Sequence, residues 1–385
     1  MSRKLRMGMI GGSLEAFIGA VHRKAAAIDG EIELVAGAFS SNPEKSKTTG
    51  KALHLDPKRV YSSYAEMIEK EKALPADQRI DFVSIVTPNH MHFDPAKMAL
   101  ENGFHVIIDK PIAFNVAEAK ALKKIVDKTG LVLALTHTYT GYPMVKEAKN
   151  MVATGKIGKV RKVYVEYPQG WLSTFLEGTG SKQASWRTDP SKSGAGGAIG
   201  DIGTHAANLA EYITGSDITE INALLNTVVK GRKLDDDSSM LIRFENGATG
   251  VLLATQVAAG DENNLNIRVY GEKGGLEWRQ EEPNTLVVKW LDKPKEVYRA
   301  GMNYLSDVAK KNCRTPSGHP EGYLEAFANI YQAFARGVRD WKPGKKINSA
   351  KYDFPDAEDG VKGMVFVETV IKSSTSNKKW ITVKY

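Results

Sequence analysis

The sequence predicts an α/β protein: a parallel sheet in its first part, then an α+β domain with a large, mostly antiparallel, open sheet. As far as about His137, short apolar runs alternate with segments of helical periodicity, whereas residues 219–299 carry consecutive strand-like runs. The length of 385 residues also exceeds the ~250–300 at which a single core stops growing. We therefore expect two domains, at residues 1–138 and 139–385.

The first domain is expected to alternate strand and helix from its beginning. Its strand-like runs are apolar almost throughout, which is typical of a parallel sheet covered on both faces. They are residues 6–10, Ile32–Ala38, Asp81–Val86, His105–Ile108 and Leu131–Thr136. Helical spacing of apolar residues marks Ala16–Ile28, Phe93–Asn102 and Val116–Thr129, and Asn42-Pro43 is typical of the start of a further helix.

In the second domain the regular alternation of strand and helix ends. A Gly/Ser/Trp-rich loop is expected over residues 168–200, and Glu245-Asn246-Gly247 and Glu272-Lys273-Gly274-Gly275 are turn signals between strands. The expected helices are Met144–Thr154, Thr204–Thr214, Tyr323–Asp340 and Ala357–Ser373, and the expected outer strands are Val160–Tyr167 and Trp380–Val383. Consecutive strands of this kind favour an antiparallel sheet.

Composition excludes several classes of protein. The single cysteine, Cys313, rules out an intramolecular disulfide and a cysteine-rich metal site, and it favours a reducing compartment. The formal charge of +8 comes from lysines dispersed among acids, which argues against a nucleic-acid partner. No run of ~20 apolar residues is present and the apolar start is too short for a signal segment, so we expect a cytoplasmic protein with no membrane contact.

Glycines follow the first strand, where the chain turns into the first helix. In the pattern G-x-G-x-x-G/A, Gly11 fits the first place, Ser13 replaces the second glycine and Ala16 fits the third. Gly11, Gly12 and Ser13 would let the backbone approach a pyrophosphate, which the N-terminus of the helix would hold. A strand-turn-helix without a ligand is the alternative.

The end of the second strand bears on the cofactor ribose. An acid at this place usually contacts the 2′-hydroxyl of NAD, but Ser40 and Ser41 stand here with no acid beside them. Lys45 or Lys47 could instead reach a 2′-phosphate. We expect NAD and leave NADP open, and a polar loop that ignores the ribose is the alternative.

Two further motifs lie at carboxyl ends of predicted parallel strands, where open α/β sheets bind ligands. One contains Thr87, Pro88, Asn89 and His92; the other is Asp109-Lys110-Pro111. His92 could simply cap the next helix. Lys110 is expected to point into a cleft rather than to be a solvated surface lysine, and Pro111 could turn the chain through a cis bond.

A possible acid–base pair occurs in Gly200-Asp201-Ile202-Gly203-Thr204-His205. Asp201 and His205 are four residues apart, so a helical turn would place both on one face. An imidazole can take the proton of an alcohol as hydride leaves the carbon, and a carboxylate can orient the ring. The alternative is an Asp N-cap beside an incidental histidine. A metal held by His92, Asp201 and His205 is not expected, because no tight ligand cluster is present.

These motifs together resemble the glucose-fructose oxidoreductase, inositol dehydrogenase and rhizopine-catabolism (Gfo/Idh/MocA) family over essentially the whole chain. The resemblance implies an N-terminal Rossmann domain, a C-terminal domain with a large open sheet, and a sugar or cyclitol bound between them. It implies that Lys110 holds the substrate hydroxyl, that His205 is the general base or acid and that Asp201 assists. Asp109 stands where the family has Glu, which shortens a side chain that would contact the cofactor.

Segments 16–23 and 184–197 look like the subgroup that contains levoglucosan dehydrogenase. By this resemblance Phe17 and Ile18 would contact the cofactor, and Trp186 and Arg187 would face both cofactor and substrate. Trp171 offers an apolar face on which sugar C–H groups can pack. Structural aromatics and a surface arginine are the alternative interpretation.

We therefore predict an NAD(P)-dependent oxidoreductase that oxidises a secondary hydroxyl of a sugar, anhydro-sugar or cyclitol. An NAD-dependent glycoside hydrolase, which oxidises its substrate transiently and cleaves it by elimination, needs the same residues. A sensor of NAD(P) or sugar is a third possibility, although it has no need of a proton acceptor. The exposed face of an open antiparallel sheet must be buried against another surface, so a homodimer or homotetramer is expected.

Overall fold

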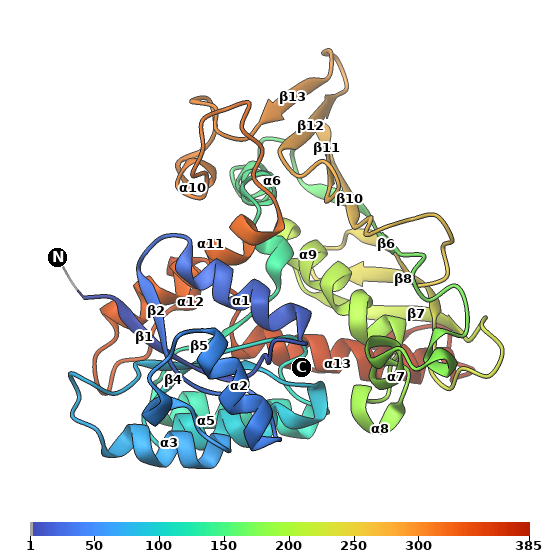
Figure 1. The fold of residues 1–385 in the computed structure, drawn as a ribbon. Coiled ribbons are helices and arrows are strands. Elements are labelled where there is room, and N and C mark those ends of the chain that lie inside the picture. Colours follow the sequence, from blue (N-terminus) through green and yellow to red (C-terminus); the bar gives the residue numbers. More distant parts are fainter. Residues whose placement is uncertain (1–2) are drawn as a thin grey trace. The chain divides into compact units, whose positions relative to one another are not determined.

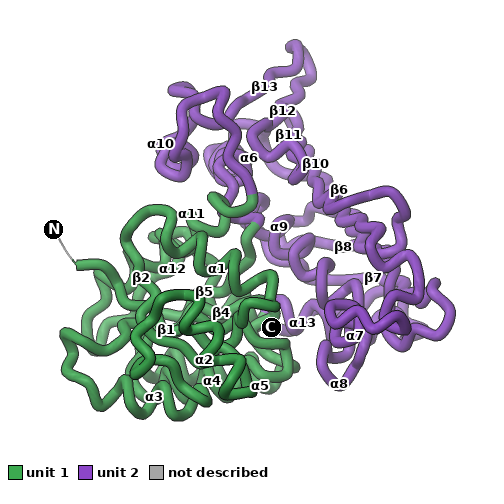
Figure 2. The backbone as a smooth tube through the Cα atoms, in the orientation of Figure 1, with its two compact units in different colours: residues 1–138, 323–361 green, residues 139–322, 362–385 purple. Residues whose placement is uncertain are grey.

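The computed structural model describes residues 3–385, which form two compact units (Figure 2). The first unit comprises the chain as far as Thr138 together with Tyr323–Val361, and the second comprises Tyr139–Gly322 and Lys362–Tyr385. The predicted boundary at 138/139 assigned Tyr323–Val361 to the second domain, whereas this segment belongs to the first unit. The apolar face of this segment explains its place there, since Phe327, Ile330 and Phe334 are buried in the same core as the first strands.

The first unit contains a five-stranded, wholly parallel sheet in the order β2-β1-β3-β4-β5 (Figure 1). The strands are β1 (Leu5–Gly11), β2 (Ile32–Ala38), β3 (Phe82–Val86), β4 (His105–Ile108) and β5 (Leu133–Leu135). Val60 adds one parallel bridge to Gly37 at the outer edge of β2, which was not predicted. The chain order reverses between β1 and β3, so their carboxyl ends form the switch point at which such sheets bind ligands.

Helices lie on both sides of this sheet: α1 packs against α11, and α4 packs against α3 and α5. Their bounds are α1 (Phe17–Ala27), α2 (Pro43–Ala52), α3 (Tyr64–Ala73), α4 (Phe93–Glu101), α5 (Val116–Thr129), α11 (Tyr323–Asp340) and α12 (Ser349–Tyr352). Short 3-10 turns are η1 (Pro57–Arg59) and η2 (Asn89–Met91). The predicted start of α2 is confirmed, because Asn42 accepts a hydrogen bond from the Lys45 N–H and Pro43 occupies the first helical turn.

The second unit contains a nine-stranded sheet in the order β13-β12-β11-β10-β6-β9-β8-β7-β14 (Figure 1). All neighbours are antiparallel except β6 and β9. The strands are β6 (Val160–Pro168), β7 (Ile218–Asn226), β8 (Asp237–Phe244), β9 (Thr249–Thr255), β10 (Asn266–Gly271), β11 (Gly274–Arg279), β12 (Thr285–Trp290), β13 (Glu296–Arg299) and β14 (Ile381–Thr382). The two predicted turn signals join β8 to β9 and β10 to β11.

Helices α6 (Pro143–Ala153) and α9 (Thr204–Thr214) pack against each other and against strands of this sheet. The remaining helical segments are η3 (Thr138–Gly141), η4 (Leu176–Thr179), α7 (Lys182–Arg187), α8 (Pro190–Ser193), η5 (Ile199–Gly203) and α10 (Asp307–Lys310). Helix α13 (Ala357–Ser374) contains the division between the units. None of the helices described is long and apolar enough to cross a membrane.

Candidate active site

The turn between β1 and α1 begins with two positions that favour glycine. Gly11 and Gly12 have φ values of 81° and 71°, in the left-handed region. A Cβ on Gly19 would come within 2.4 Å of the Gly12 Cα, so the first turn of α1 crosses directly over this loop. The close approach therefore falls at Gly19 rather than at Ala16, and a glycine seven residues after Gly12 was the signal that could have revealed it.

The N-terminus of α1 is suited to hold an anion. The helix has no acidic residue in its first turn, and Ala16 at the N-cap provides no side-chain hydrogen bond, so no side chain at the N-cap or in the first turn competes with an anion for the first backbone N–H groups. Arg23 donates to the Gly12 carbonyl at 2.5 Å, which fixes the loop from behind. Phe17 is 70% exposed beside it, while Ile18 is partly buried. These residues fit the pyrophosphate of a dinucleotide.

The loop after β2 contains Ser40 and Ser41 and has no acid among residues 39–42. The Ser40 hydroxyl accepts a hydrogen bond from the Asn42 N–H at 3.1 Å, and Ser41 is exposed. Lys45 lies 3.2 Å from Glu15, and Lys47 lies 2.9 Å from Glu44. Both lysines that could reach a 2′-phosphate therefore have acidic partners.

The motif after β3 is linked to the motif after β4 by one imidazole. His92 is 1% exposed; its Nδ1 lies 2.6 Å from the Pro111 carbonyl oxygen, and its Nε2 lies 2.8 Å from the Thr87 carbonyl oxygen. His92 occupies the N-cap position of α4, but its side chain makes no capping bond. Burial lowers the pKa of His92. A neutral ring has one N–H and donates to one of these carbonyl oxygens, while the buried side chain packs between the two loops that carry Thr87-Pro88-Asn89 and Lys110-Pro111.

Asp109 turns its carboxylate toward the interior of the first unit. Its Oδ1 accepts hydrogen bonds from the Thr136 hydroxyl at 2.7 Å and from the Lys110 N–H at 3.0 Å. Burial alone would raise the pKa of Asp109, but His22, Thr136 and Lys110 lower it to about 2. The peptide bond between Lys110 and Pro111 is cis. Lys110 is partly buried, and its charge acts on the buried His137, whose pKa falls to about 3, mainly through burial.

Asp201 and His205 lie at the start of α9 in the second unit. Asp201 belongs to η5, a π-helical turn of a kind often found at functional sites, and His205 is in the first α-helical turn. Asp201 Oδ2 accepts a hydrogen bond from Gln256 at 2.9 Å and lies 3.4 Å from the Arg187 guanidinium. The His205 ring is 9% exposed and packs edge-on against Tyr139, with ring centroids 4.8 Å apart.

Asp235 holds the N-terminal end of this helical segment. Its carboxylate accepts hydrogen bonds from the N–H groups of Gly197 at 2.6 Å and Ile199 at 2.8 Å. A Cβ on Gly197 would come within 2.1 Å of the Asp235 carbonyl oxygen, so glycine is required there. Burial raises the pKa of Asp235. Asp235 was not predicted, since the residues that it caps are 36 and 38 positions away in the sequence.

Trp171, Trp186 and Arg187 form one cluster in the second unit. The Arg187 guanidinium lies 4.2 Å from the Trp186 ring and 5.8 Å from the Trp171 ring, within the range of cation–π attraction. The Trp171 indole N–H donates to Gln169 at 3.1 Å. Arg187 therefore joins the two tryptophans to Asp201.

A chain of neutral polar groups extends from this cluster. Tyr167 donates to the Asn263 amide oxygen at 2.7 Å, the Gln169 amide donates to the same oxygen at 2.5 Å, and Tyr139 contacts Tyr167 through its hydroxyl. Gln256 lies between Gln169 and Asp201. None of these five residues was predicted, since amides and tyrosines are common throughout the sequence and only the fold brings them together.

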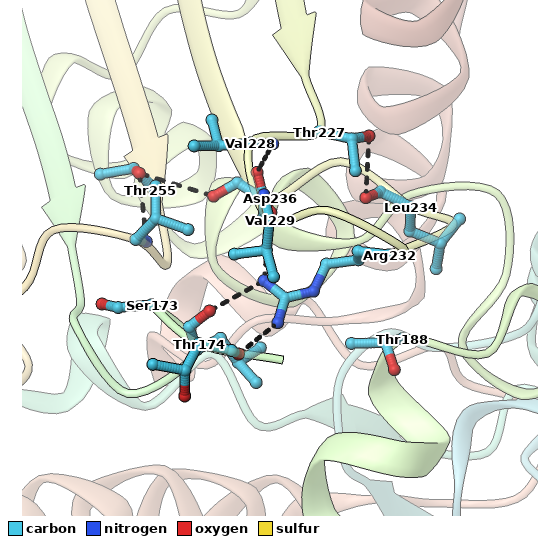
Figure 3. A network of polar contacts seen from close by, with 12 residues as sticks. Ser173, Thr174, Thr188, Thr227, Val228, Val229, Arg232, Leu234, Asp236 and Thr255 are labelled. Atoms are coloured by element: carbon cyan, nitrogen blue, oxygen red, sulfur yellow. Dashed lines mark hydrogen bonds and ion pairs between the residues drawn. The ribbon is translucent and has the colours of Figure 1, made fainter. Parts of the chain in front are cut away.

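The loop after Trp171 is anchored by Arg232, as Figure 3 shows. Arg232 donates to the carbonyl oxygens of Leu172 at 2.9 Å and Thr174 at 3.0 Å. It also pairs with Glu177 at 2.8 Å and with Asp236 at 3.1 Å. Asp236 in turn accepts from the Val228 N–H at 2.7 Å (Figure 3). A buried guanidinium thus fixes the loop beside Trp171.

The predicted site residues divide between the units. The glycine turn, Ser40, Ser41, Thr87, His92 and Lys110 belong to the first unit, and Trp171, Trp186, Arg187, Asp201 and His205 belong to the second. Within the second unit, Arg187 joins Asp201 to both tryptophans. Within the first, Asp109 joins Lys110 to Thr136. Among residues 3–385 no group of three or more His, Cys, Asp or Glu side chains is placed to hold a metal ion.

Comparison with known proteins decides the family. A model of the oxidoreductase family with an NAD-binding Rossmann fold (GFO_IDH_MocA) matches residues 5–137, and a GFO/IDH/MocA C-terminal domain model matches residues 145–277. An oxidoreductase structure from Sinorhizobium meliloti is 44% identical, with 99% of this chain and 100% of that chain covered and a TM-score of 0.88. The chain belongs to the Gfo/Idh/MocA family.

Two further structures of this family contain ligands. An inositol dehydrogenase homologue from Azotobacter vinelandii, complexed with NADH and myo-inositol, is 33% identical, covers 99% of this chain and 98% of its own, and has a TM-score of 0.89. A levoglucosan dehydrogenase, complexed with NADH and levoglucosan, is 25% identical over 100% of both chains, with a TM-score of 0.85. This Gfo/Idh/MocA chain is therefore an oxidoreductase with an NAD-binding Rossmann domain, and the predicted family, fold class and cofactor are confirmed.

Proposed function

We propose that this protein oxidises a secondary hydroxyl of a neutral sugar, anhydro-sugar or cyclitol. NAD⁺ is the hydride acceptor. His205 takes the hydroxyl proton as the C–H hydrogen leaves with its electron pair, so that the products are a ketone, NADH and a protonated imidazole. Asp201 stabilises that imidazolium, and Lys110 donates a hydrogen bond to the reacting oxygen.

The observation that carries this proposal is the setting of Asp201 and His205. They share the start of one helix, and the Asp201 carboxylate accepts a hydrogen bond from the Gln256 amide, which continues to Gln169, and lies 3.4 Å from the Arg187 guanidinium. Amides both donate and accept hydrogen bonds, which suits the hydroxyls of an uncharged polyol. The indole of Trp171 supplies an apolar surface beside them for sugar C–H groups.

The first unit supports a preference for NAD over NADP. A 2′-phosphate would need a free cation near the end of β2, but Lys45 is paired with Glu15 and Lys47 with Glu44. Glu15 would in addition repel a phosphate placed near Lys45. Ser40 and Ser41 remain to contact the ribose hydroxyls. Gly11, Gly12, Ser13 and the N-terminus of α1 would hold the pyrophosphate. Thr87, Pro88 and Asn89 would line the nicotinamide side, and the buried His92 would support their loop from within.

A panel assay tests the reaction. Purified protein is incubated with levoglucosan, myo-inositol and a set of neutral pyranoses, with NAD⁺ and NADP⁺ in parallel, and NADH absorbance is followed. We expect net NADH formation with at least one polyol, faster with NAD⁺, and its loss in Lys110→Ala and His205→Ala. Cleavage of an aryl glycoside without net NADH would show the eliminating hydrolase instead. Tight NAD⁺ binding with no turnover on the whole panel would show a sensor.

We also propose a homo-oligomer in which a second copy covers the open face of the nine-stranded sheet. Leu241 is 46% exposed on β8 and lies in register with Val251 on β9, which in turn lies beside Tyr164 on β6. This row of apolar side chains on neighbouring strands needs a partner of the same character. Light scattering of wild type and Leu241→Lys tests it: the wild type should have at least twice the monomer mass, and the variant should dissociate.

A further inference from the structure

A buried chain of polar side chains lies behind the Asp109-Lys110 turn of the first unit. Ser84 Oγ is 2.9 Å from the Tyr331 hydroxyl, and that hydroxyl is 2.8 Å from His22 Nδ1. On the other side of the ring, His22 Nε2 lies 3.9 Å from Asp109 Oδ1. Ser84, Tyr331 and His22 are almost wholly buried. They come from β3, α11 and α1, and the chain ends at the carboxylate after β4.

The donors and acceptors of Ser84, Tyr331 and His22 determine the direction of the hydrogen bonds between them. When Tyr331 donates to His22 Nδ1, the Ser84 hydroxyl donates to Tyr331, and a neutral ring carries its proton on Nε2. Every donor except that N–H is then used. The opposite direction would place a lone pair of Nε2 toward the Asp109 carboxylate, and two acceptors facing each other in a buried site repel. The geometry therefore favours an Nε2–H group aimed at Asp109.

The position of His22 is restricted by aromatic neighbours. Its ring packs edge-on against Phe327, with centroids 4.7 Å apart, and against Tyr331 at 5.8 Å. Among residues 3–385 the Nε2 atom has no hydrogen-bond partner, although the side chain is 0% exposed. A gap of 3.9 Å is longer than a hydrogen bond, but hydrogen bonds in catalytic centres are often long before ligands bind and shorten in the complex.

We propose that His22, oriented by Tyr331, is a positioning residue that fixes Asp109 and thereby the backbone from which Lys110 projects. The inference rests on the role proposed above for Lys110. Asp109 Oδ1 accepts the Lys110 N–H, so a rotation of the carboxylate displaces that peptide group. Thr136, directly after β5, donates to the same oxygen, and His22 supplies the second anchor from α1.

The short side chain of Asp109 fits this arrangement. The shorter side chain keeps the carboxylate close to the end of β4, where it reaches Thr136 and the Lys110 N–H. The imidazole of His22 lies near the same Oδ1 atom, so Asp109 and His22 act together. A longer acid would carry its oxygens past both partners.

Three variants test the proposal with levoglucosan or myo-inositol, whichever the wild type oxidises with NAD⁺. His22→Met removes both ring nitrogens and should lower kcat on the order of ten- to hundredfold, the effect of a displacement near 1 Å. His22→Gln keeps an N–H donor and should recover part of that loss. Tyr331→Phe should lower kcat less, since the ring remains and only its orienting hydroxyl is lost. KM for the sugar should change by less than about threefold, because binding to Asp201 and His205 is untouched.

The second measurement does not depend on turnover. Nitrogen-15 spectra of the imidazoles in protein without NAD should show His22 as the Nε2–H tautomer, and Tyr331→Phe should shift it toward a mixture. Tyr61→Phe is the matched control: Tyr61 is a buried tyrosine of the same unit whose hydroxyl donates to Glu71 at 2.8 Å. It should lower the melting temperature to a similar extent and leave both kcat and the His22 signals unchanged.

The outcomes separate this inference from the proposed function. A His22→Met enzyme within twofold of wild-type kcat, alongside an inactive Lys110→Ala, would overturn the inference and leave the function standing. Normal turnover by Lys110→Ala would overturn the function itself. An Nδ1–H tautomer for His22 would overturn the inference whatever the activities. If His22→Met does not fold, Tyr331→Phe and the tautomer measurement decide.

Discussion

The guanidinium Nε of Arg187 lies 3.4 Å from Asp201 Oδ2. The pair is partly exposed, with 27% and 19% of the side-chain surfaces accessible, so its electrostatic energy is modest and its geometry matters more. Arg187 stacks on Trp186 and reaches Trp171, while Asp201 also accepts a hydrogen bond from Gln256. One arginine thus joins the aromatic surface proposed for the sugar to the carboxylate proposed to assist His205.

Replacement of Arg187 should therefore affect catalysis more than stability. Arg187→Met is expected to lower kcat/KM on the order of ten- to hundredfold, because Asp201 loses its contact with the guanidinium and the tryptophans lose their link to the carboxylate. The unfolding free energy should change by less than about 1 kcal/mol. Lys192→Met is the control, since Lys192 pairs with Asp189 in the same loop without touching Asp201. Equal kinetics for the two variants would contradict the role of Arg187.

Gly19→Ala should weaken NAD binding selectively. The added Cβ would lie 2.4 Å from the Gly12 Cα, so α1 must move away from the loop that is proposed to hold the pyrophosphate. We expect the NAD⁺ dissociation constant, measured by titration calorimetry, to rise at least tenfold. Gly363→Ala is the control, because a Cβ there meets nothing within 4 Å and alanine favours helix. Unchanged affinity in Gly19→Ala would place the cofactor away from this turn.

Loss of Arg232 should destabilise the second unit. Arg232→Met leaves Asp236, whose side chain is 0% exposed, and Glu177, which is 11% exposed, without their cation. Breaking a buried pair in this way costs about 3–5 kcal/mol. Urea unfolding measures the loss. Arg243→Met removes the exposed pair with Glu220 and should cost less than about 1 kcal/mol, so similar losses in the two variants would contradict the buried role of Arg232.

Glu211 should make stability depend on pH. Burial raises its pKa to about 7, although the Ile218 N–H and the Tyr385 hydroxyl donate to it. An unfolded glutamate titrates near ~4.3, so the protonated form stabilises the fold fully below that pH, and the contribution is lost as the pH rises through 7. The change is on the order of 3–4 kcal/mol, since each pKa unit corresponds to about 1.4 kcal/mol.

The measurement is urea unfolding of wild type and Glu211→Gln at pH 5, 6, 7 and 8. The wild type should lose stability relative to the variant as the pH rises, since the amide stays neutral throughout. Parallel curves would show that Glu211 does not titrate in this range. The difference between the two proteins removes the contributions of all other groups.

Much of the fold could be predicted because its signals are local. Apolar runs marked all five strands of the parallel sheet, and Asn42-Pro43 marked the start of α2. The spacing of Asp201 and His205 placed both at one helical junction, although the π-helical form of that turn was not foreseen. Each of these features depends on residues within a few positions of one another.

What the sequence by itself determined is therefore the order of elements, the glycine turn and the Asp201–His205 pair. Only the tertiary structure decided which distant residues support them: Gln256 beside Asp201, Asp235 at Gly197, and Tyr331 beside Ser84 across 247 residues. The reason is physical. A buried polar atom needs a partner, and the packing of sheets and helices, rather than proximity in the chain, determines which donor or acceptor lies within reach.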